Sequence, residues 1–345
     1  MRTLFITLLL FLNILSFSQT DTIKIQTEPQ AEDFYNDGLA QFNSKNFQTA
    51  FDLFSTAITK KNDFEQAYYN RALSLMELGK FNEALSDFDK TIELNSLADN
   101  SHYYKGEAFL SLKDKDKALK SFEIALSLNQ KNYQANYKLA VLLFEKNKLE
   151  EALKYLDHAI SAKPDFSYAL NDRGSIKMEL GKLEDAVIDY KKALESNPDM
   201  AFTYNNLGTA YRKMKKFDLA IEAYNKAISL NKKYFVAINN RGSAKLEKND
   251  IDGSIADFTL ALEINPEYNF AYNNRANAYY KKKNYSAAIN DCNKAIEKNS
   301  SYGEAYYNRG VAKEMMKDFE GACKDLRKAQ QLGIERAKQF LDVCE

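Results

Sequence analysis

A regular repeat runs through most of this 345-residue chain and constrains its fold more than any other feature. Nine units follow one another without an insertion, and they begin at Ala31, Glu65, Asp99, Tyr133, Ser167, Ala201, Phe235, Asn269 and Gly303. We call them repeats 1 to 9, and we number the positions in each as slots 1 to 34. A fixed period of roughly 20–50 residues indicates an array of small units, each burying its apolar face against its neighbours.

Three slots hold a small residue in almost every repeat. Slot 8 is Gly38, Ala72, Gly106, Ala140, Gly174, Gly208, Gly242, Ala276 and Gly310. Slots 20 and 27 hold Ala in all but two cases, Ser254 and Thr91. Apolar residues spaced three and four apart indicate helices, and two helices approach closely only where the facing side chains are small. The pattern therefore predicts two helices per repeat, with a large residue at slot 24 filling the remaining space.

The composition agrees with a helical chain. Gly (12 residues) and Pro (4 residues) are scarce, and both disfavour helix interiors. Slot 31 is Asn or Gly in seven repeats, a residue type that suits a left-handed helix end. These residues are Asn95, Asn129, Asn197, Asn231, Asn265, Asn299 and Gly333. The sequence thus predicts an all-α array whose second helices end at slot 31.

This pattern resembles the tetratricopeptide repeat, and the resemblance covers residues 31–336 as nine repeats. It implies an all-α, right-handed superhelical solenoid of helix-turn-helix repeats that acts without enzymatic activity. It also implies that the first helices line a concave groove where ligands bind. Residues 337–345 continue the apolar stripe of the register, and we predict that they form a capping helix.

Residues 1–18 have the features of a secretory signal peptide. Arg2 supplies a positive charge, an apolar run covers residues 4–17, and Ser16 and Ser18 have the spacing that a signal peptidase prefers. We predict cleavage after Ser18, a polar linker over residues 19–30, and a mature chain that is periplasmic or secreted. An uncleaved membrane anchor is the alternative, although a spanning helix needs about 20 apolar residues. No later stretch is apolar enough to insert into a membrane.

Arg at slot 7 and Asp at slot 23 occur in the same five repeats. The pairs are Arg71 with Asp87, Arg173 with Asp189, Arg241 with Asp257, Arg275 with Asp291, and Arg309 with Asp325. Because paired change indicates contact, we predict structural ion pairs between the two helices, within a repeat or across a repeat boundary. Descent of these five repeats from one ancestral unit would give the same pattern without contact.

Slot 6 is Asn in six repeats: Asn36, Asn70, Asn206, Asn240, Asn274 and Asn308. Asn is a mediocre helix former, so its recurrence inside a helix needs another reason. A side-chain amide can donate to and accept from a peptide backbone at once. The slot resembles the asparagine ladder of long superhelical tetratricopeptide domains, which hold extended peptides.

We therefore predict a peptide-binding groove that includes Asn70, Asn206, Asn240, Asn274 and Asn308. Asn171, Asn205, Asn239 and Asn273, at slot 5, are expected to widen it. Tyr35, Tyr69, Tyr103, Tyr137 and Tyr307 occupy slot 5 elsewhere and are expected to form aromatic walls. A solvated Asn face without a ligand, inherited by duplication, is the alternative.

The three cysteines have different expected roles. Cys323, in the second helix of repeat 9, should face Cys344 in the capping helix, and an exported protein can keep a disulfide there. Cys292 occupies the large slot 24 and is expected to be a buried, inert thiol.

Composition and motifs disfavour an enzyme or a nucleic-acid-binding protein. The chain has 48 basic and 48 acidic residues and a formal net charge of zero, so it lacks the overall basic excess of a nucleic-acid binder. No phosphate-binding loop, nucleophile elbow or zinc-protease motif occurs. We therefore expect no cofactor and no metal, and we predict a protein-interaction scaffold that binds an extended peptide or a partner protein. A structural or self-assembling subunit of a cell-envelope complex is the alternative.

Overall fold

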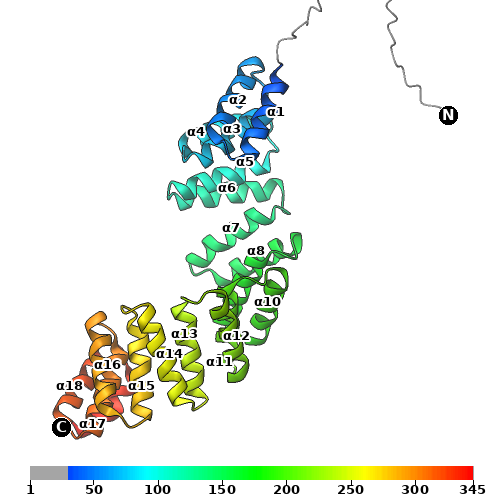
Figure 1. Ribbon diagram of the computed structural model, residues 1–345. Helices are drawn as coiled ribbons and strands as arrows, with labels where there is room; N and C mark the ends of the chain where they lie inside the picture. The colour runs from blue at the N-terminus through cyan, green and yellow to red at the C-terminus, as the bar shows by residue number, and fades with distance from the viewer. Residues whose placement is uncertain (1–29, 345) are drawn as a thin grey trace, which may run out of the picture. The chain divides into compact units, whose positions relative to one another are not determined.

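A computed structural model describes residues 30–344 of the chain (Figure 1). Each odd-numbered helix begins at the first residue of a repeat. The helices are α1 (Ala31–Asn43), α2 (Phe47–Lys60), α3 (Glu65–Glu77), α4 (Phe81–Leu94), α5 (Asp99–Ser111), α6 (Lys115–Leu128), α7 (Tyr133–Glu145), α8 (Leu149–Ala162), α9 (Ser167–Glu179), α10 (Leu183–Ser196), α11 (Ala201–Lys213), α12 (Phe217–Leu230), α13 (Phe235–Glu247), α14 (Ile251–Ile264), α15 (Asn269–Lys281), α16 (Tyr285–Lys298), α17 (Gly303–Met315), α18 (Phe319–Gln331) and the 3₁₀ helix η1 (Glu335–Val343). The predicted signal peptide (1–18) and the linker up to residue 29 lie outside the described residues.

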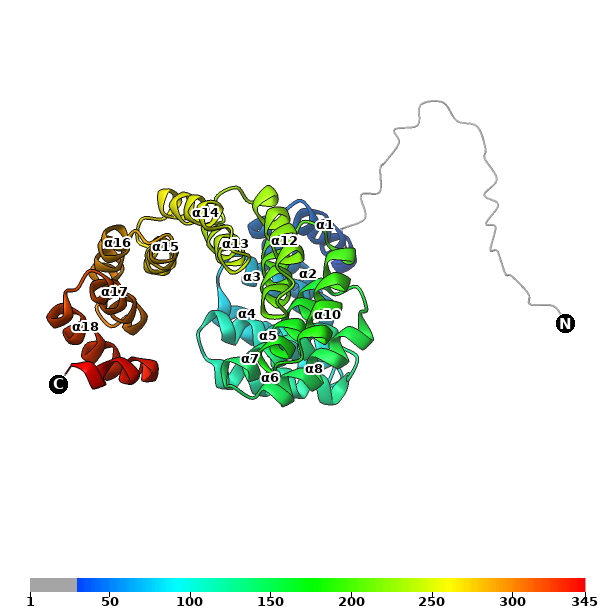
Figure 2. The same cartoon turned by 90° about the horizontal axis from the view of Figure 1, so that it is seen from below.

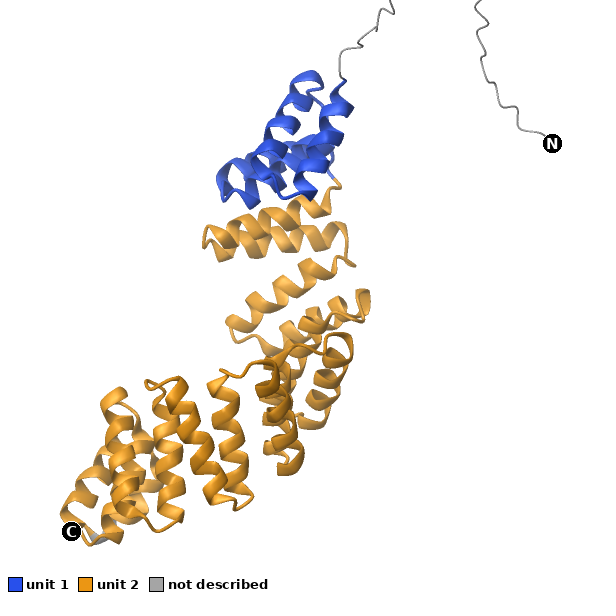
Figure 3. Cartoon of the chain, in the orientation of Figure 1, with its two compact units in different colours: residues 1–96 blue, residues 97–345 orange. Residues whose placement is uncertain are grey.

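The described residues divide into two compact units, 30–96 and 97–344 (Figure 3). In the described residues, the first unit holds repeats 1 and 2, and the second holds repeats 3 to 9 and η1. Within each unit the two helices of a repeat pack together, and the second helix packs on the first helix of the next repeat. In the second unit, α9, α11, α13, α15 and α17 also contact one another in succession. Figure 2 shows α13 with α14, α15 with α16, and α17 with α18 as successive hairpins.

The small residues lie where the two helices of a repeat meet. In repeat 6, Ala220 and Ala227 have no exposed surface, and neither does the large Tyr224 at slot 24. A Cβ atom built on Gly208 would lie 2.7 Å from Cε1 of Tyr224. Because real Cβ atoms do not approach a ring so closely, the glycine is needed for this helix spacing. The same slots are buried in the other repeats, so the 34-residue pattern records the packing of each hairpin.

The turn between the two helices has one residue in the left-handed region at slot 15. These residues are Lys45, Gly79, Lys113, Asn147, Gly181, Lys215, Asn249, Lys283 and Lys317. Two are glycine, which adopts this conformation without steric cost, whereas a lysine such as Lys215 (φ 58°) adopts it with strain. The packed helices therefore impose the turn geometry on residues that do not favour it.

The expected left-handed helix end at slot 31 was wrong for the asparagines. Asn129, Asn197 and Asn299 have extended backbones, with φ of −142°, −145° and −147°. The side-chain Oδ1 of Asn129 instead accepts a hydrogen bond from the backbone N–H of Lys131 at 3.1 Å, as in an Asx turn. Asn supports either geometry, and the chain must extend here to begin the next repeat. Gly333, with φ 89°, is left-handed as expected.

A 3₁₀ helix, η1, covers the last repeat where a capping helix was predicted over residues 337–345. Ala337 is fully buried, and Phe340 packs on Tyr307 with ring centroids 5.9 Å apart. Cys344 forms a disulfide with Cys323 of α18, with Cα atoms 5.7 Å apart and 21 residues of separation. In the chain-entropy model, closing a loop of this size stabilises the fold by about 3 kcal/mol. The disulfide therefore ties the end of the chain to repeat 9.

Candidate functional site

Asparagines of successive first helices are hydrogen-bonded to one another in the second unit. In repeats 6 to 9, the slot-6 Nδ2 donates to Oδ1 of the slot-5 asparagine in the preceding repeat. The pairs are Asn206 to Asn171 (3.2 Å), Asn240 to Asn205 (3.0 Å), Asn274 to Asn239 (3.0 Å) and Asn308 to Asn273 (2.9 Å). We call these four pairs the asparagine staples. The slot-5 members are buried and the slot-6 members are half-buried.

The two slots have different roles in the staples: slot 5 accepts the hydrogen bond and slot 6 donates it. The slot-5 asparagines, expected to widen a ligand ladder, are buried against the next repeat and accept its hydrogen bond. A slot-6 amide uses one N–H in its staple and keeps a second N–H and an Oδ1 with two lone pairs. In repeat 7 that Oδ1 also accepts from Asn239 at 3.4 Å, within the same helix. The staple therefore fixes the orientation of each half-buried amide while leaving part of its hydrogen-bonding capacity.

A related bond joins repeats 1 and 2 in the first unit. Nδ2 of Asn70 donates to the hydroxyl of Tyr35 at 3.1 Å and to the backbone carbonyl of Gln66 at 2.9 Å. The Tyr35 ring packs on Phe54 and Phe64, with centroids 5.7 Å and 4.9 Å away. The slot-5 tyrosines expected to be aromatic walls are thus packing residues, because their rings reach the core or the next repeat.

Exposed aromatic rings occur instead at slot 2, which the sequence analysis did not single out. The side chains of Tyr168, Phe202 and Phe270 are 49%, 36% and 48% exposed. The Tyr168 and Phe202 rings are stacked, with centroids 6.1 Å apart. Slot 2 lies four residues before slot 6, so each ring shares a helix face with the slot-6 side chain. An aromatic residue at slot 2, on the same helix face as slot 6, was the signal that could have found them.

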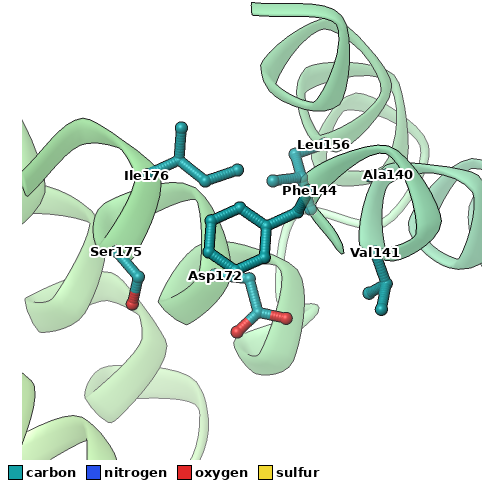
Figure 4. A pocket seen from close by; sticks show the side chains of 7 residues that line it. All are labelled: Ala140, Val141, Phe144, Leu156, Asp172, Ser175 and Ile176. Carbon is teal, nitrogen blue, oxygen red and sulfur yellow. The ribbon is translucent and has the colours of Figure 1, made fainter. Parts of the chain in front are cut away.

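A small apolar pocket lies at the boundary between repeats 4 and 5 (Figure 4). Its volume is about 140 Å³, and its lining comes from α7, α8 and α9. The lining residues are Ala140, Val141, Phe144, Leu156, Asp172, Ser175 and Ile176. Figure 4 shows the carboxylate of Asp172 and the hydroxyl of Ser175 on one side of the Phe144 ring, with Ile176 on the other. The pocket therefore combines apolar walls with one carboxylate.

Asp172 occupies slot 6 of repeat 5, where the following four repeats have Asn. Its carboxylate accepts hydrogen bonds from the hydroxyl of Tyr137 and from Nδ2 of Asn171, both at 2.9 Å. Burial raises the pKa of Asp172 above its ordinary value, although both hydrogen bonds lower it. Burial and the nearby Asp172 charge also raise the pKa of Tyr137. Tyr137 and Asp172 join repeats 4 and 5 through the same two slots as the asparagine staples.

The structure brings together all five Arg–Asp pairs at slots 7 and 23. In each, Nε and one terminal nitrogen of Arg donate to the two oxygens of Asp, as in Arg173 with Asp189 (2.9 and 2.6 Å). The other pairs are Arg71 with Asp87, Arg241 with Asp257, Arg275 with Asp291, and Arg309 with Asp325. All five Asp side chains are buried, so these two-point contacts hold the hairpins and do not face a ligand.

Each of these arginines also reaches the preceding repeat. The remaining terminal nitrogen of Arg173 donates to Asp157 at 2.7 Å, and that of Arg241 donates to Asn225 at 2.7 Å. The equivalent acceptors for Arg71, Arg275 and Arg309 are Ser55, Thr259 and Asn293. The Arg–Asp pairs therefore act within a repeat and across its boundary.

The free cysteine among the described residues lies in the packed interior. Cys292 is a fully buried free thiol, and burial raises its pKa to about 12.

Residues 30–344 contain no cluster of His, Cys, Asp and Glu that could hold a metal ion. In the same range, no helix is both long and apolar enough to cross a bilayer.

Comparison with known proteins addresses the fold. Models described as "Tetratricopeptide repeat" match residues 69–126, 109–171, 201–234, 236–268, 270–302 and 304–332, and a model described as "TPR repeat" matches 174–215. A search of curated proteins gave no match.

Three solved structures illustrate the similarity. A tetratricopeptide repeat protein from Parabacteroides merdae is 24% identical, with a TM-score of 0.59 over 71% of this chain and 97% of that one. A chain of the APC/C hetero-tetramer Cut9–Hcn1 is 16% identical, with a TM-score of 0.58 over 90% of this chain and 75% of that one. The C-terminal part of a tetratricopeptide repeat protein from Cytophaga hutchinsonii is 17% identical, with a TM-score of 0.55 over 70% and 98%.

At these sequence identities, the similarity to solved structures shows the fold alone. The solved structures are tetratricopeptide solenoids, and the matching family models begin in repeat 2 and continue into repeat 9. The helix pairs of the described residues have the same organisation. On the matched models, the helix pairs and these structures together, the chain belongs to the tetratricopeptide-repeat family.

Proposed function

We propose that this chain is a non-enzymatic protein-interaction scaffold that binds an extended segment of a partner protein along the first helices of repeats 5 to 9. Membership of the tetratricopeptide-repeat family supports the scaffold role. The observation that carries the groove proposal is the row of four stapled amides, one on each of α11, α13, α15 and α17. Each presents a donor and an acceptor in a fixed orientation.

The spacing of such a row suits a peptide backbone. Packed helices lie about 8–10 Å apart, and an extended chain advances about 3.3 Å per residue. A peptide running across the first helices would therefore bring a backbone amide to a new slot-6 side chain about every third residue. Because backbone amides are present in any sequence, this contact gives affinity without strong sequence selection.

The staples also reduce the entropy cost of binding. Immobilising a free side chain at an interface costs about 0.5–1.5 kcal/mol. The hydrogen bond from Asn240 to Asn205 already restrains the slot-6 amide before a ligand arrives. The exposed rings of Phe202 and Phe270, on the same helix faces, add apolar surface for ligand side chains.

Alanine substitution of the slot-6 asparagines tests the proposal. The variant Asn206→Ala, Asn240→Ala, Asn274→Ala, Asn308→Ala should co-purify far less partner protein from an envelope fraction than the wild-type chain does. The matched control is Asn82→Ala with Asn290→Ala, at exposed positions on second helices. Circular dichroism should show the same helicity for all three chains. Unchanged partner recovery would contradict the groove proposal and favour a structural or self-assembling subunit.

A second variant separates binding from packing, because the slot-6 amides also join repeats. Asn205→Ala, Asn239→Ala and Asn273→Ala remove staple acceptors but keep the slot-6 amides. This chain should bind the partner more weakly than wild type and more strongly than the slot-6 variant. Equal losses in both variants would indicate that the amides act through packing alone.

We also propose that the mature chain is exported to the periplasm or secreted. The disulfide between Cys323 and Cys344 supports this location, since disulfides persist in oxidising compartments. Mass spectrometry of the protein from cell fractions should find an N-terminal peptide that begins at Gln19, outside the cytoplasm. A peptide beginning at Met1, or recovery from the cytoplasm alone, would contradict the proposal.

A further inference from the structure

The boundary between repeats 4 and 5 offers a ligand more specific contacts than an amide row does. The pocket there holds about 140 Å³ between Val141, Phe144, Leu156 and Ile176. A dry cavity of about this size with similar walls accepts a small apolar group. The Phe144 side chain is 42% exposed, so the apolar lining reaches the surface. One aliphatic side chain of a bound peptide would fill this space.

Asp172, which lines the same pocket, is a half-buried carboxylate without a cation. Its partners are the hydroxyl of Tyr137 and the amide of Asn171, both neutral. Within residues 30–344, no lysine or arginine forms an ion pair with it. Asp189, in the same repeat, receives both Arg173 and Lys177. A carboxylate held partly away from water without a counter-charge is complementary to a cation supplied from outside.

The exposed ring of Tyr168 also favours a cation near Asp172. Tyr168 lies one helical turn before Asp172 in α9, so the two side chains share a helix face. Its ring is 49% exposed and is stacked on Phe202. An exposed ring beside a carboxylate can contact the aliphatic stem or the charged group of a lysine or arginine.

We propose that the pocket and Asp172 form an anchor subsite for an apolar side chain and a lysine or arginine two positions away from it in an extended peptide. This inference rests on the proposed function, because it assigns sequence selectivity to the same peptide-binding face. In an extended chain, residues two apart point to the same side. The apolar side chain enters the pocket, and the cation pairs with Asp172 at its edge.

Selection from a phage-displayed library of random heptapeptides tests the subsite, with mature chain (residues 19–345) as bait. The wild-type chain should enrich peptides with an apolar residue and a Lys or Arg two positions away from it. Asp172→Asn should keep the apolar preference and lose the basic one. A selected peptide should bind this variant roughly tenfold more weakly, as expected for loss of a charge-assisted contact. Phe144→Ala should instead lose the apolar preference.

Asp172→Asn should fold normally, because repeats 6 to 9 carry Asn at this slot and Tyr35 with Asn70 shows that a Tyr–Asn pair fits. Asp185→Asn and Ile188→Ala, at exposed positions on α10, are matched controls and should select as wild type does. The same basic enrichment with wild type and Asp172→Asn would overturn the subsite, as would enrichment of acidic residues or no enrichment.

The slot-6 alanine variant of repeats 6 to 9 distinguishes this failure from failure of the proposed function. Peptides that lose affinity for that variant but not for Asp172→Asn would refute the subsite and leave the groove in place. Peptides that depend on Asp172 and Phe144 but not on the slot-6 asparagines would support the subsite and refute the role of the staples. A wild-type chain that selects no peptide would refute both.

Discussion

Two stretches of the second unit use the same pair of slots for different chemistry. From repeat 5 to repeat 9, each boundary is joined by a pair of neutral asparagine amides. The boundary between repeats 4 and 5 is joined by the hydroxyl of Tyr137 and the carboxylate of Asp172. The sequence separation is 35 residues in both stretches. Slots 5 and 6 therefore join adjacent first helices in both stretches, and the residue types at these slots decide whether the boundary carries a charge.

The difference has consequences for recognition. The amide stretch offers donors and acceptors that match any peptide backbone. The Tyr137–Asp172 boundary offers an apolar pocket and one negative charge, which match particular side chains. A scaffold with both would combine general affinity with one point of selectivity, and the two properties could be changed separately by mutation.

The largest predicted effect tests whether buried ion pairs stabilise the two stretches equally. Asp189 in repeat 5 and Asp257 in repeat 7 each receive an Arg and a Lys and are almost fully buried. Replacing either Asp by Ala removes the buried carboxylate that the Arg and the Lys share, whereas Arg173 keeps Asp157 and Arg241 keeps Asn225. This change should reduce the free energy of unfolding by about 3–5 kcal/mol. Urea denaturation followed by circular dichroism measures the loss.

Comparable losses in the two repeats would confine the difference between the stretches to slots 5 and 6 of the first helices. A loss below about 1 kcal/mol in one repeat would show that the buried ion pairs are not equivalent. Glu184→Ala, at an exposed position on α10, is the control and should change the free energy of unfolding little.

The second prediction compares the two kinds of joining pair by double-mutant cycles. Tyr137→Phe with Asp172→Ala should give a coupling energy of about 1.5–3 kcal/mol, because one partner is charged. Asn205→Ala with Asn240→Ala should give about 1 kcal/mol, typical of a neutral hydrogen bond. The coupling energies come from the free energies of unfolding of each single and double variant. A stronger coupling for the asparagine pair would reverse the comparison.

The fold could be predicted from the sequence because its constraints recur in every repeat. Gly208 and Ala220 are small since a helix lies against them, and the same geometry returns nine times. The Arg–Asp pairs were detectable because both partners change together inside one repeat. The turn conformation was not detectable, because Lys215 and Lys283 have no preference for a left-handed backbone and adopt it under the packing of the helices.

The candidate site was predicted less completely, because its contacts join residues of different repeats. The slot-6 asparagines were identified, but their partners at slot 5 lie in the preceding repeat. A comparison within repeats therefore missed the link between Asn205 and Asn240, although the sequence holds it at a fixed separation. Asp172 could have been noticed as the carboxylate among the slot-6 asparagines. The pocket beside it depends on the distance between α7 and α9, which residue types alone do not specify.

The third prediction uses pH to sharpen the contrast between Asp172 and the asparagines. Burial raises the pKa of Asp172 in the folded chain above its ordinary value. The wild-type chain therefore loses stability as the pH rises from that ordinary value through the raised pKa. Asp172→Asn does not titrate, so its stability relative to wild type should increase over this window and then stay constant. Urea denaturation of both chains from pH 3 to pH 8 measures the difference.

The reciprocal change completes this test. Asn206→Asp places a carboxylate beside the Oδ1 of Asn171 and removes the amide that donated to it. This chain should be less stable than wild type at neutral pH and should recover part of the loss on acidification. A pH-independent difference for both variants would mean that the charge at slot 6 does not distinguish the two stretches.

The smallest predicted effect concerns the turns of repeats 5 and 6, which differ in residue type but have the same left-handed backbone. Slot 15 is Gly181 (φ 77°) in repeat 5 and Lys215 (φ 58°) in repeat 6. A left-handed L-residue costs about 1–2 kcal/mol, and glycine loses about 0.5–1 kcal/mol more backbone entropy on folding. Lys215→Gly should therefore raise the free energy of unfolding by about 0.5 kcal/mol, and Gly181→Lys should lower it by a similar amount. If both substitutions lower it, the lysine side chain must stabilise its turn by a contact that offsets the strain, and the two turns would then differ in more than residue type.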